Sequence, residues 1–420
     1  MIPPIKPPAS ILVIGAGIGQ IPLLERAKAR GLRTIVVSKP GDYPGFALAD
    51  ETCSLDIFDR EAITKYARDR SIDAVITEQN DLTAPTAAFV AERLGLPGNT
   101  FDQVTAYCNK SRFRSNCDVL GIPAPRHVSI DSADCPPLSF VHVPFPWMVK
   151  PEDSQSSMGV SRINVPADFS TAVSHALAHS PSRRAILEEF FQGREVVCEG
   201  FVRRGVYFHL AFGDRKYFTL PGLFIPSQTL FPSTLPETFK ERILACERKM
   251  VAHVGLKFAI IHSEYLVNER TGEFRAVESA PRGGGVYIAS HLIPHVTGID
   301  VTDLVLDLAL GQDVDVAALF AHKTSRAAGY VCFHLPEGRI VSVEGREALA
   351  ELPGIIATFL DGIHPGARVG PMLYKGNRKG PILVGAPDRV SLEHRIQAVQ
   401  NTLSATVETA DGRLEGIHWS

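Results

Sequence analysis

The chain has 420 residues, a formal net charge of −3 and an apolar fraction of 45%. Its length predicts about two to four domains with a large buried core, and its near-neutral charge gives no electrostatic basis for binding nucleic acid or an anionic membrane. The seven cysteines are scattered, odd in number and free of CxxC pairs, which indicates reduced thiols. The start, Met1–Pro8, is too rich in proline for a signal peptide, and no apolar run approaches a membrane span. We therefore expect a cytoplasmic globular protein.

A βαβ pattern opens the chain. A buried strand is predicted over Ser10–Ile14, and the glycine-rich turn at residues 15–20 resembles a dinucleotide fingerprint. The third glycine of that fingerprint is replaced by Gln20, and the second strand ends in Ser38 and Lys39 instead of an acid for a ribose hydroxyl. We interpret the segment as a tight strand-to-helix turn in a doubly wound α/β domain, and a nicotinamide-dependent dehydrogenase as the least favoured function.

Two lysines in the next part of the chain stand at informative places. Lys110 opens a predicted helix, where a cation is unfavourable for the helix dipole, so a ligand for it is indicated. Lys150 lies near the end of an apolar strand, where a cation more often faces solvent. The loop at residues 153–160 carries small hydroxyl residues and one glycine, Gly159. Such a loop can present backbone N–H groups to phosphates or form a mobile hairpin tip.

The middle of the chain alternates strands with polar connections. The segment Glu188–Glu195 joins two predicted strands, either as a hinge that hydrogen-bonds a base and a ribose or as a plain polar link. A strand is predicted over Val206–Phe212, followed by a charged turn at residues 213–216. The stretch Phe218–Leu235, rich in proline and aromatic residues, is predicted to be an ordered loop.

Two strands joined by a turn at residues 269–272 carry the strongest chemical signal. If they pair in antiparallel fashion, they place Glu264 and Glu278 side by side. Arg282 and three glycines follow. Paired carboxylates with an arginine suit Mg²⁺ and a transferring phosphate. The alternative is a hairpin with an acidic edge and an ordinary turn.

From about Thr324 the pattern changes to short strands and turns, which predicts a third, small α/β domain ending in a helix over Leu392–Leu403 and a polar tail. The loop between Gly370 and Gly380 contains three basic residues. A solvated turn is the favoured interpretation of this loop, and a functional basic loop is the alternative. Its basic residues are Lys375, Arg378 and Lys379.

These motifs occur in a fixed order over about residues 110–310: lysine at a helix start, strand with lysine, small-residue loop, Glu-Glu-aromatic connection, carboxylate strand and Glu-x-x-x-Arg-Gly-Gly. The order resembles the ATP-grasp ligases, and the last third resembles the L-amino-acid ligase (dipeptide synthetase) branch of carboxylate–amine ligases. The resemblance implies an α/β ATP-grasp fold with a doubly wound pre-ATP-grasp domain, central ATP-grasp subdomains and a small C-terminal closing domain. The implied boundaries are 1–108, 109–320 (nucleotide-covering subdomain about 126–190) and 321–420.

The resemblance also implies roles for individual residues. Lys110 and Lys150 match the lysines that contact nucleotide phosphates, Glu188 the acid near the adenine amino group and Glu195 the ribose-binding acid. The residues expected to bind ATP are Lys110, Lys150, Ser154, Ser156, Ser157, Gly159, Val160, Glu188, Glu189, Phe190, Phe191 and Glu195.

Glu264 and Glu278 match the carboxylates that bridge Mg²⁺. Arg282 matches the arginine that steadies the transferring phosphate, and with Glu278 and Gly284 it is expected to be catalytic. Many relatives have an asparagine two residues after the second acid as a further metal ligand, where this chain has Ala280; alanine also occurs there in the amino-acid ligase branch. The residues expected to contact substrate are His262, Arg282, Gly283, Gly284 and Tyr287.

The implied function is an ATP-dependent ligase that joins a small carboxylate to an amine, with amino acids as the expected substrates. ATP and two Mg²⁺ ions are the expected cofactors, with Mn²⁺ as an alternative metal. Two other functions stay open: activation of formate or bicarbonate, as in purine-pathway or carboxylase enzymes, and an inactive ATP-binding regulatory module. No nucleic acid or membrane partner is expected, and a homodimer is left open.

Overall fold

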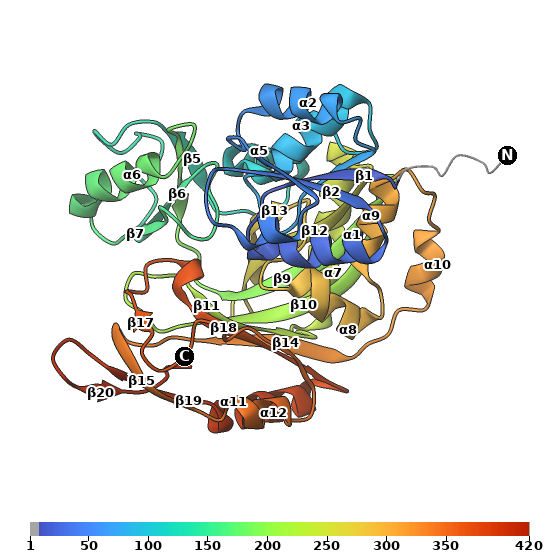
Figure 1. Cartoon of the computed structure of the whole chain (residues 1–420). Coiled ribbons are helices and arrows are strands. Elements are labelled where there is room, and N and C mark those ends of the chain that lie inside the picture. Colours follow the sequence, from blue (N-terminus) through green and yellow to red (C-terminus); the bar gives the residue numbers. More distant parts are fainter. Residues whose placement is uncertain (1–7, 420) are drawn as a thin grey trace.

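The computed structural model describes residues 8–419, whose strands form four sheets. Figure 1 shows the N-terminal domain above, a small sheet at its side and the C-terminal part below a long central sheet. The proline-rich start lies outside the described residues apart from Pro8, so the prediction about it stays untested. In the described part of the chain, no helix is both long and apolar enough to cross a bilayer.

The N-terminal domain is a parallel sheet of order β3-β2-β1-β4 with helices on both faces, which confirms the doubly wound prediction. At the first turn the Gln20 side chain is buried and donates to the carbonyl of Glu78, so it fills the space under the turn. The elements are β1 (Ser10–Ile14), α1 (Ile21–Ala29), β2 (Arg33–Ser38), β3 (Glu51–Ser54), α2 (Arg60–Asp69), β4 (Ala74–Ile76), α3 (Ala84–Leu94) and α4 (Phe101–Cys108).

A small antiparallel sheet of order β5-β8-β6-β7 forms a separate lobe, with a helix packed on it. The helix that Lys110 opens precedes this lobe and ends at Gly121, whose φ of +63° suits the left-handed helix cap. The elements are α5 (Lys110–Leu120), β5 (His127–Ile130), β6 (Trp147–Pro151), β7 (Ser161–Ile163), α6 (Phe169–Ala178) and β8 (Ala185–Glu189).

The central sheet has eight strands in the order β13-β12-β9-β10-β11-β14-β18-β16. One helix, α9, packs against β4 on one side and β12 on the other, so it joins the N-terminal sheet to the central one. The elements up to this helix and just beyond are β9 (Arg194–Arg203), β10 (Val206–Tyr217), β11 (Pro226–Phe231), α7 (Glu237–Val254), β12 (Phe258–Asn268), β13 (Glu273–Ala280), α8 (Ile293–Thr297), α9 (Val301–Ala309) and α10 (Val316–Ala321).

Two predictions in this sheet were wrong. The charged turn at residues 213–216 is the second half of strand β10, and the ordered loop contains strand β11. Asp214 and Arg215 are buried in β10 because charged partners from distant parts of the chain meet them there: Asp214 pairs with Arg194 and Arg389. The charged residues therefore made this strand look like a turn, because their pairing partners lie elsewhere in the sequence.

The C-terminal part shares the central sheet, because β14, β18 and β16 continue it. A second sheet, of order β17-β15-β19-β20, packs beside it with α11 and α12. The predicted polar tail contains the last two strands. The elements are β14 (Ala327–Phe333), β15 (Gly338–Glu344), α11 (Arg346–Ala350), β16 (Ile355–Thr358), β17 (Arg368–Val369), β18 (Lys379–Ala386), α12 (Arg389–Thr402), β19 (Ser404–Glu408) and β20 (Leu414–Glu415).

Candidate active site

The two predicted carboxylates are cross-strand neighbours. Strands β12 and β13 pair in antiparallel fashion, and Glu264 stands opposite Glu278 in their register. The register shifts directly after Glu264, at a β-bulge. Bulges often re-aim a side chain at a functional site. The predicted pairing of the two acids is confirmed.

A cavity of about 630 Å³, which we call the first cavity, lies between the small sheet and the central sheet. It collects residues from the α5 start, the 154–160 loop, the β8–β9 connection and the carboxylate strands. Of the residues predicted to bind ATP, it is lined by Lys110, Lys150, Ser154, Ser156, Ser157, Val160, Glu188, Glu189, Phe190, Phe191 and Glu195, together with Glu264 and Glu278.

Gly159 does not line this cavity. Its φ is +73°, and a Cβ at this position would lie 2.7 Å from both His179 and Pro151, so glycine is needed here for backbone conformation and close packing. The same loop reaches the N-terminal domain, because the backbone N–H of Asp81 donates to Gln155 Oε1 over 2.9 Å. Ser156 and Ser157 both have a φ of +60°, which is uncommon for residues with a side chain.

Glu188 forms an ion-pair cluster at the end of β8 in which Glu188 and Arg114 are buried. Arg114 Nε donates to its Oε1 over 2.7 Å, and Lys150 Nζ lies 2.7 Å from its Oε2. Burial alone would raise the pKa of Glu188, but the two cations outweigh burial and lower it to about 2. Lys150, for which solvent exposure was the more common expectation, is instead 13% exposed and held in place by this carboxylate.

Lys110 connects the loop to the carboxylate strands. Its Nζ donates to the Ser154 carbonyl over 2.8 Å and lies 3.1 Å from Glu278 Oε1. Burial lowers the pKa of Lys110, but the facing Glu278 carboxylate outweighs burial and leaves the pKa above its ordinary value. The lysine therefore stays charged at the point where the loop meets the acids.

Arg215 is the main site residue that the sequence analysis missed. Its guanidinium is buried between Glu195 and Glu264: its Nη1 lies 2.5 Å from Glu195 Oε1 and also bonds Glu264 Oε1. Tyr217 donates to the other oxygen of Glu195. Burial raises the pKa of Glu264, yet Arg215 outweighs it and the pKa lies well below the usual range. Three charged residues in succession, Asp214, Arg215 and Lys216, gave no sequence signal that this position lies in a buried strand.

A second cavity, of about 860 Å³, adjoins the first. It lies between the N-terminal domain, the glycine-containing segment after β13 and the C-terminal part. The two cavities share six lining residues, and these are Gln155, Ser156, Arg215, Glu264, Glu278 and Lys375.

Only some of the residues predicted to contact substrate line this second cavity. His262, Arg282 and Tyr287 line it, and so does Gly285, whereas Gly283 and Gly284 lie outside its lining. A Cβ on Gly284 would lie 2.9 Å from His262 Nδ1 and 3.0 Å from Glu199 Oε1, so these two glycines make room for buried side chains behind the wall.

Arg282 is held in a fork by Asp81 from the N-terminal domain. Nε and Nη2 of Arg282 donate to the two carboxylate oxygens of Asp81, each over 2.7 Å. His262 Nδ1 bonds the buried Glu199 carboxylate. Burial lowers the pKa of His262, but Glu199 outweighs burial and raises it above its ordinary value. Both side chains are thus fixed before any ligand arrives.

Part of the basic loop before β18 faces the cavities, although Leu373, Tyr374 and Gly376 are exposed. Lys375 lines both cavities and Arg378 lines the second. Arg378 Nη1 donates to the Pro226 carbonyl over 2.9 Å, which holds it toward the central sheet. The alternative of a functional basic loop therefore stays a prediction for these two residues.

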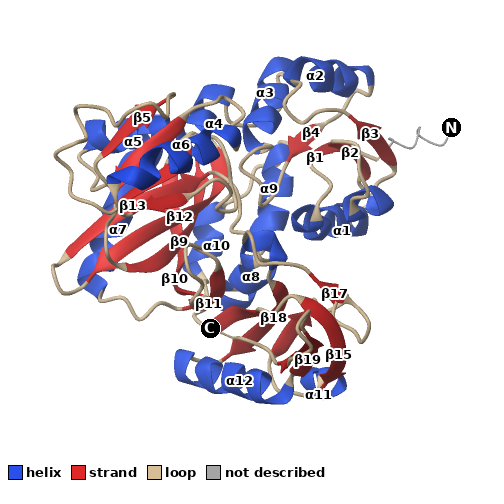
Figure 2. Ribbon diagram, turned by 90° about the vertical axis from the view of Figure 1, so that its left-hand side faces the viewer, coloured by secondary structure: helices blue, strands red, loops and turns tan. Residues whose placement is uncertain are grey.

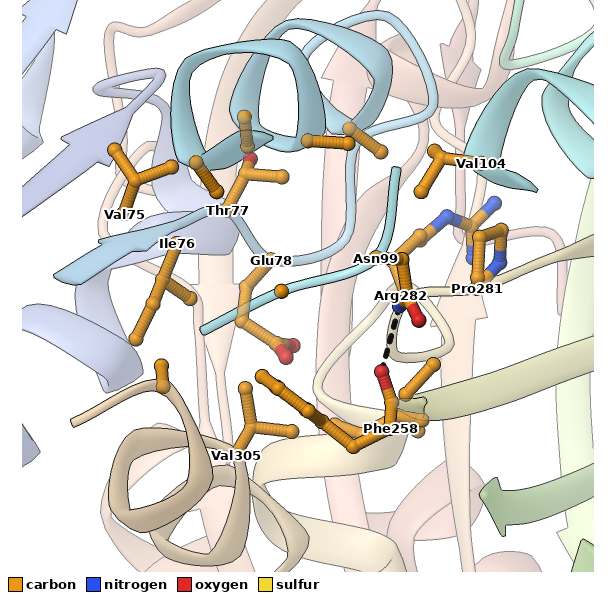
Figure 3. A pocket seen from close by; sticks show the side chains of 18 of the residues that line it. Val75, Ile76, Thr77, Glu78, Asn99, Val104, Phe258, Pro281, Arg282 and Val305 are labelled. Atoms are coloured by element: carbon orange, nitrogen blue, oxygen red, sulfur yellow. Dashed lines mark hydrogen bonds between the residues drawn. The ribbon is translucent and has the colours of Figure 1, made fainter. Parts of the chain in front are cut away.

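A third cavity, of about 90 Å³, lies behind Arg282 between the N-terminal sheet and α9. Figure 3 shows its mostly apolar wall around Glu78, whose Oε2 has no hydrogen-bond partner among the described residues. Burial raises the pKa of Glu78 to about 7, although Arg282 and Arg26 act in the opposite direction. The cavity is too small for a nucleotide.

The carboxylate pair fits a divalent cation in its donor chemistry. Mg²⁺ is commonly held by one or two carboxylates together with substrate phosphates. Glu264 and Glu278 face both cavities, while Ala280 brings no side-chain oxygen. Among residues 8–419, no group of three or more histidine, cysteine or acidic side chains is arranged to hold a metal. These two acids are the candidate protein ligands.

Comparison with known proteins follows the same division of the chain. Family models match for the ATP-grasp N-terminal domain over residues 24–98, the ATP-grasp domain over 143–290 and the L-amino acid ligase C-terminal domain 2 over 331–408.

Two curated relatives match less than half of the chain. A formate-dependent phosphoribosylglycinamide formyltransferase of Prochlorococcus marinus is 27% identical over 188 residues, covering 44% of this chain and 48% of that protein. A D-alanine–D-alanine ligase of Chlorobium luteolum is 25% identical over 197 residues, covering 43% and 52%. The matched region thus spans about half the length of these relatives.

Solved structures are similar over nearly the whole chain. The L-amino acid ligase from Bacillus licheniformis has a TM-score of 0.78 at 22% identity, covering 95% of this chain and 98% of that one. Phosphoribosylglycinamide synthetase from Anaerococcus prevotii has a TM-score of 0.75 at 16% identity, covering 95% and 99%. This chain therefore contains an ATP-grasp N-terminal domain and an ATP-grasp domain, followed by a C-terminal domain of the L-amino acid ligase type.

Proposed function

We propose that this protein is an ATP-dependent carboxylate–amine ligase that forms an amide or peptide bond through an acyl phosphate and releases ADP and phosphate. The observation that carries the proposal is the junction of the two cavities at Glu264 and Glu278. One cavity suits a nucleotide and the other a small organic substrate, and the reacting groups would meet where the cavities join.

The first cavity has the parts that a nucleotide needs. Phe190 and Phe191 offer apolar surface beside the acids of the β8–β9 connection. Lys110 and Lys150 bring positive charge toward the phosphates. Glu188 is already saturated by Arg114 and Lys150. We therefore propose that Glu188 positions Lys150. This role would add to the contact with the adenine amino group that the family resemblance implies for Glu188.

The second cavity offers arginines for a carboxylate. Transfer of the γ-phosphoryl group would form a bond from the carboxylate oxygen to phosphorus and break the bond to ADP. Such a transfer depends on alignment and charge neutralisation more than on a protein nucleophile. Arg282 and Arg215 are fixed at this place by Asp81, Glu195 and Glu264.

In the second step an amine attacks the acyl carbon. The C–N bond forms and the C–O bond to phosphate breaks, and the leaving phosphate takes the one proton that the amine nitrogen loses while the other stays on the amide nitrogen. Arg282 would stabilise the oxyanion that develops on the acyl oxygen. The 154–160 loop would cover the site and exclude water, which otherwise hydrolyses the acyl phosphate.

Glu264 and Glu278 are the residues that would hold Mg²⁺, and the ion would neutralise the charge of the phosphates. Ala280 offers no side-chain oxygen as a further metal ligand. If two ions bind, both would therefore share Glu264 and Glu278 as protein ligands. A homodimer stays a prediction; one neighbour of known structure, a 2-oxoglutarate carboxylase domain from Hydrogenobacter thermophilus, is described as a dimer.

The test is release of phosphate from ATP with Mg²⁺ across panels of carboxylates and amines. We expect release that depends on both an amino acid donor and an amine. Release that depends on formate or bicarbonate would replace the proposal with the second candidate function, for which the formate-dependent relative is the supporting observation. ATP binding without turnover under every condition would indicate an inactive nucleotide-binding module.

A further inference from the structure

Glu199 is a fully buried acid that lies outside the lining of both large cavities. It belongs to β9, and its exposed fraction is 0%. One carboxylate oxygen, Oε1, accepts a hydrogen bond from His262 Nδ1, whereas Oε2 has no hydrogen-bond partner among the described residues. A buried carboxylate that is only partly satisfied costs free energy. Stability alone therefore does not explain an acid at this position.

The pairing register places Glu199 and His262 beside the junction acids. Glu199 of β9 stands opposite His262 of β12, and Ala280 of β13 stands opposite His262 on its other side. Two residues further along β12, the next row contains Glu264 and Glu278. Residues directly opposite each other share a face of the sheet, and so do residues two apart on one strand. Because Ala280 brings only a methyl group, the polar side chains of the first row come from β9 and β12.

His262 connects Glu199 to Glu264. Its Nε2 lies 3.4 Å from Glu264 Oε1 and 3.4 Å from Arg215 Nη2, and Arg215 is itself paired with Glu264. The His262 side chain is only 5% exposed, although it lines the second cavity. Both ring nitrogens therefore have a partner, with Glu199 on the inner side and the Arg215–Glu264 pair on the side of the junction.

The segment after β13 packs directly against this pair. A Cβ on Gly284 would lie 2.9 Å from His262 Nδ1 and 3.0 Å from Glu199 Oε1, so the backbone approaches the hydrogen bond more closely than any other residue type would allow. A ring that is held by packing and by a hydrogen bond can keep a neighbouring ligand group in one orientation.

From these contacts we infer that Glu199 is a positioning residue of the active site. Glu199 fixes the imidazole ring of His262, and the ring holds the Glu264 carboxylate and Arg215 in place at the junction. Because Glu199 lines neither cavity, it acts only through His262. The inference rests on the proposed ligase function, in which Glu264 is a candidate ligand of the divalent cation.

The affinity for Mn²⁺ tests this inference without relying on turnover. Mn²⁺ accepts carboxylate ligands as Mg²⁺ does, and free Mn²⁺ is measured by electron paramagnetic resonance while the full chain is titrated in the presence of ADP. We expect Glu199→Met, which has no acceptor for His262 Nδ1, to raise the Kd for Mn²⁺ about 10- to 100-fold. Glu199→Gln keeps an oxygen acceptor and should stay within about 3-fold of the wild type.

A second substitution at the same position keeps the test informative if Glu199→Met does not fold. Glu199→Asp retains the charge but withdraws the carboxylate by one methylene, so it should also raise the Kd for Mn²⁺. An unchanged Kd in the folded Met or Asp variant would overturn the inference. Equal increases in Glu199→Gln and Glu199→Met would overturn it as well, because the hydrogen bond to His262 would not be the cause.

A double variant tests whether Glu199 acts through His262. His262→Leu removes both ring nitrogens, so adding Glu199→Met to it should change the Kd for Mn²⁺ by less than about 2-fold. Independent effects that multiply in the double variant would contradict the proposed connection. If His262 instead contacts only substrate, His262→Leu would raise the KM for substrate and leave the Kd for Mn²⁺ unchanged, which would also overturn the inference.

Glu247→Met is the matched control. Glu247 is likewise a buried acid beside β12, but it accepts a hydrogen bond from Tyr265 and lines neither cavity. We expect this variant to keep the Kd of the wild type for Mn²⁺. A rise equal to that of Glu199→Met would indicate general loosening of the sheet and would overturn the specific role of Glu199.

The two readouts separate this inference from the proposed function. If no substrate pair releases phosphate but Glu199→Met raises the Kd for Mn²⁺, the ligase proposal fails and the positioning role stands. If phosphate is released with a carboxylate and an amine, and every Glu199 variant binds Mn²⁺ as the wild type does, the inference fails alone.

Discussion

The first and second cavities differ in how their charges are satisfied. In the first, Glu188 is bonded by Arg114 and Lys150, and Glu195 by Arg215 and Tyr217, all from within the chain. In the second, Asp81 likewise holds Arg282, but Asp361, which is exposed, and Arg378 have no ion-pair partner among the described residues. Ion pairs within the chain fix the side chains before a ligand binds, whereas charges without such a partner are available to pair with the ligand. In the proposed ligase, the preorganised groups would serve phosphoryl transfer and the remaining charges would serve substrate recognition.

The largest effect is expected at the junction. Glu278→Gln removes the negative charge that pairs with Lys110 and that would hold the metal. We expect phosphate release to fall at least about 1,000-fold while the protein stays folded, because transfer depends on charge at this point.

Glu273→Gln is the control for this variant, since Glu273 opens the same strand and is exposed. Phosphate release and circular dichroism would be measured for both. Full activity of Glu278→Gln would show that the junction does not carry the chemistry.

The pairing in the first cavity predicts a large loss of stability when one partner is removed. Arg114 is fully buried, and Arg114→Met leaves the Glu188 carboxylate with Lys150 alone. We expect the free energy of unfolding to fall by about 3–5 kcal/mol, as measured by urea denaturation.

The matched control is Arg112→Met, on the same helix, whose ion pair with Asp102 is exposed. Its effect should stay within about 1 kcal/mol. Similar losses for the two variants would mean that the Glu188 cluster contributes no more than a surface pair.

The pH dependence of stability tests Glu78, which lies behind the second cavity. Its pKa is raised by burial to about 7 from an ordinary value of 4.5. Between these pH values the folded chain binds a proton that the unfolded chain has lost. Stability therefore falls as pH rises through this window, by an amount on the order of 3 kcal/mol, and the loss is complete above about pH 7.

Glu78→Gln should remove this pH dependence of the free energy of unfolding. The stability of the variant relative to the wild type should therefore rise from pH 4.5 to pH 8. Urea denaturation at several pH values gives the measurement. Glu241→Gln, an exposed change on α7, should leave the slope unchanged. Parallel profiles for Glu78→Gln and the wild type would rule out the raised pKa.

The smallest effect is expected from two adjacent glycines beside the second cavity, of which only Gly285 lines it. A Cβ on Gly284 would approach His262 and Glu199, whereas a Cβ on Gly285 meets nothing within 4 Å. We expect Gly284→Ala to lower kcat about 10- to 100-fold through displacement of His262, and Gly285→Ala to stay within about 3-fold. Steady-state kinetics would measure both, and equal losses would contradict a steric cause.

Local patterns in the sequence predicted much of the nucleotide side of the site. The antiparallel pair of Glu264 and Glu278 followed from two strands and a short turn, and the helix start at Lys110 followed from a spacing signal. Such features depend on residues close together in the chain, where periodicity and turn residues are informative. The ligand roles of these residues stay predictions.

The substrate side could not be predicted in the same way. Arg215 was assigned to a turn because four charged or small residues in succession look like one, yet Glu195 and Glu264 make a strand acceptable there. Lys375 and Arg378 were assigned to a solvated loop, because nothing near them in sequence shows that the loop faces two cavities.

The sequence by itself determined the order of the motifs, the fold class and the pair of acids at the junction. Only the tertiary structure decided which charges are paired and which remain free, since Arg282 meets Asp81 across 201 positions and Arg114 meets Glu188 across 74. The physical reason is that hydrogen bonds within helices, turns and hairpins are local, whereas a buried charge needs a partner in space, and that partner can come from anywhere in the chain.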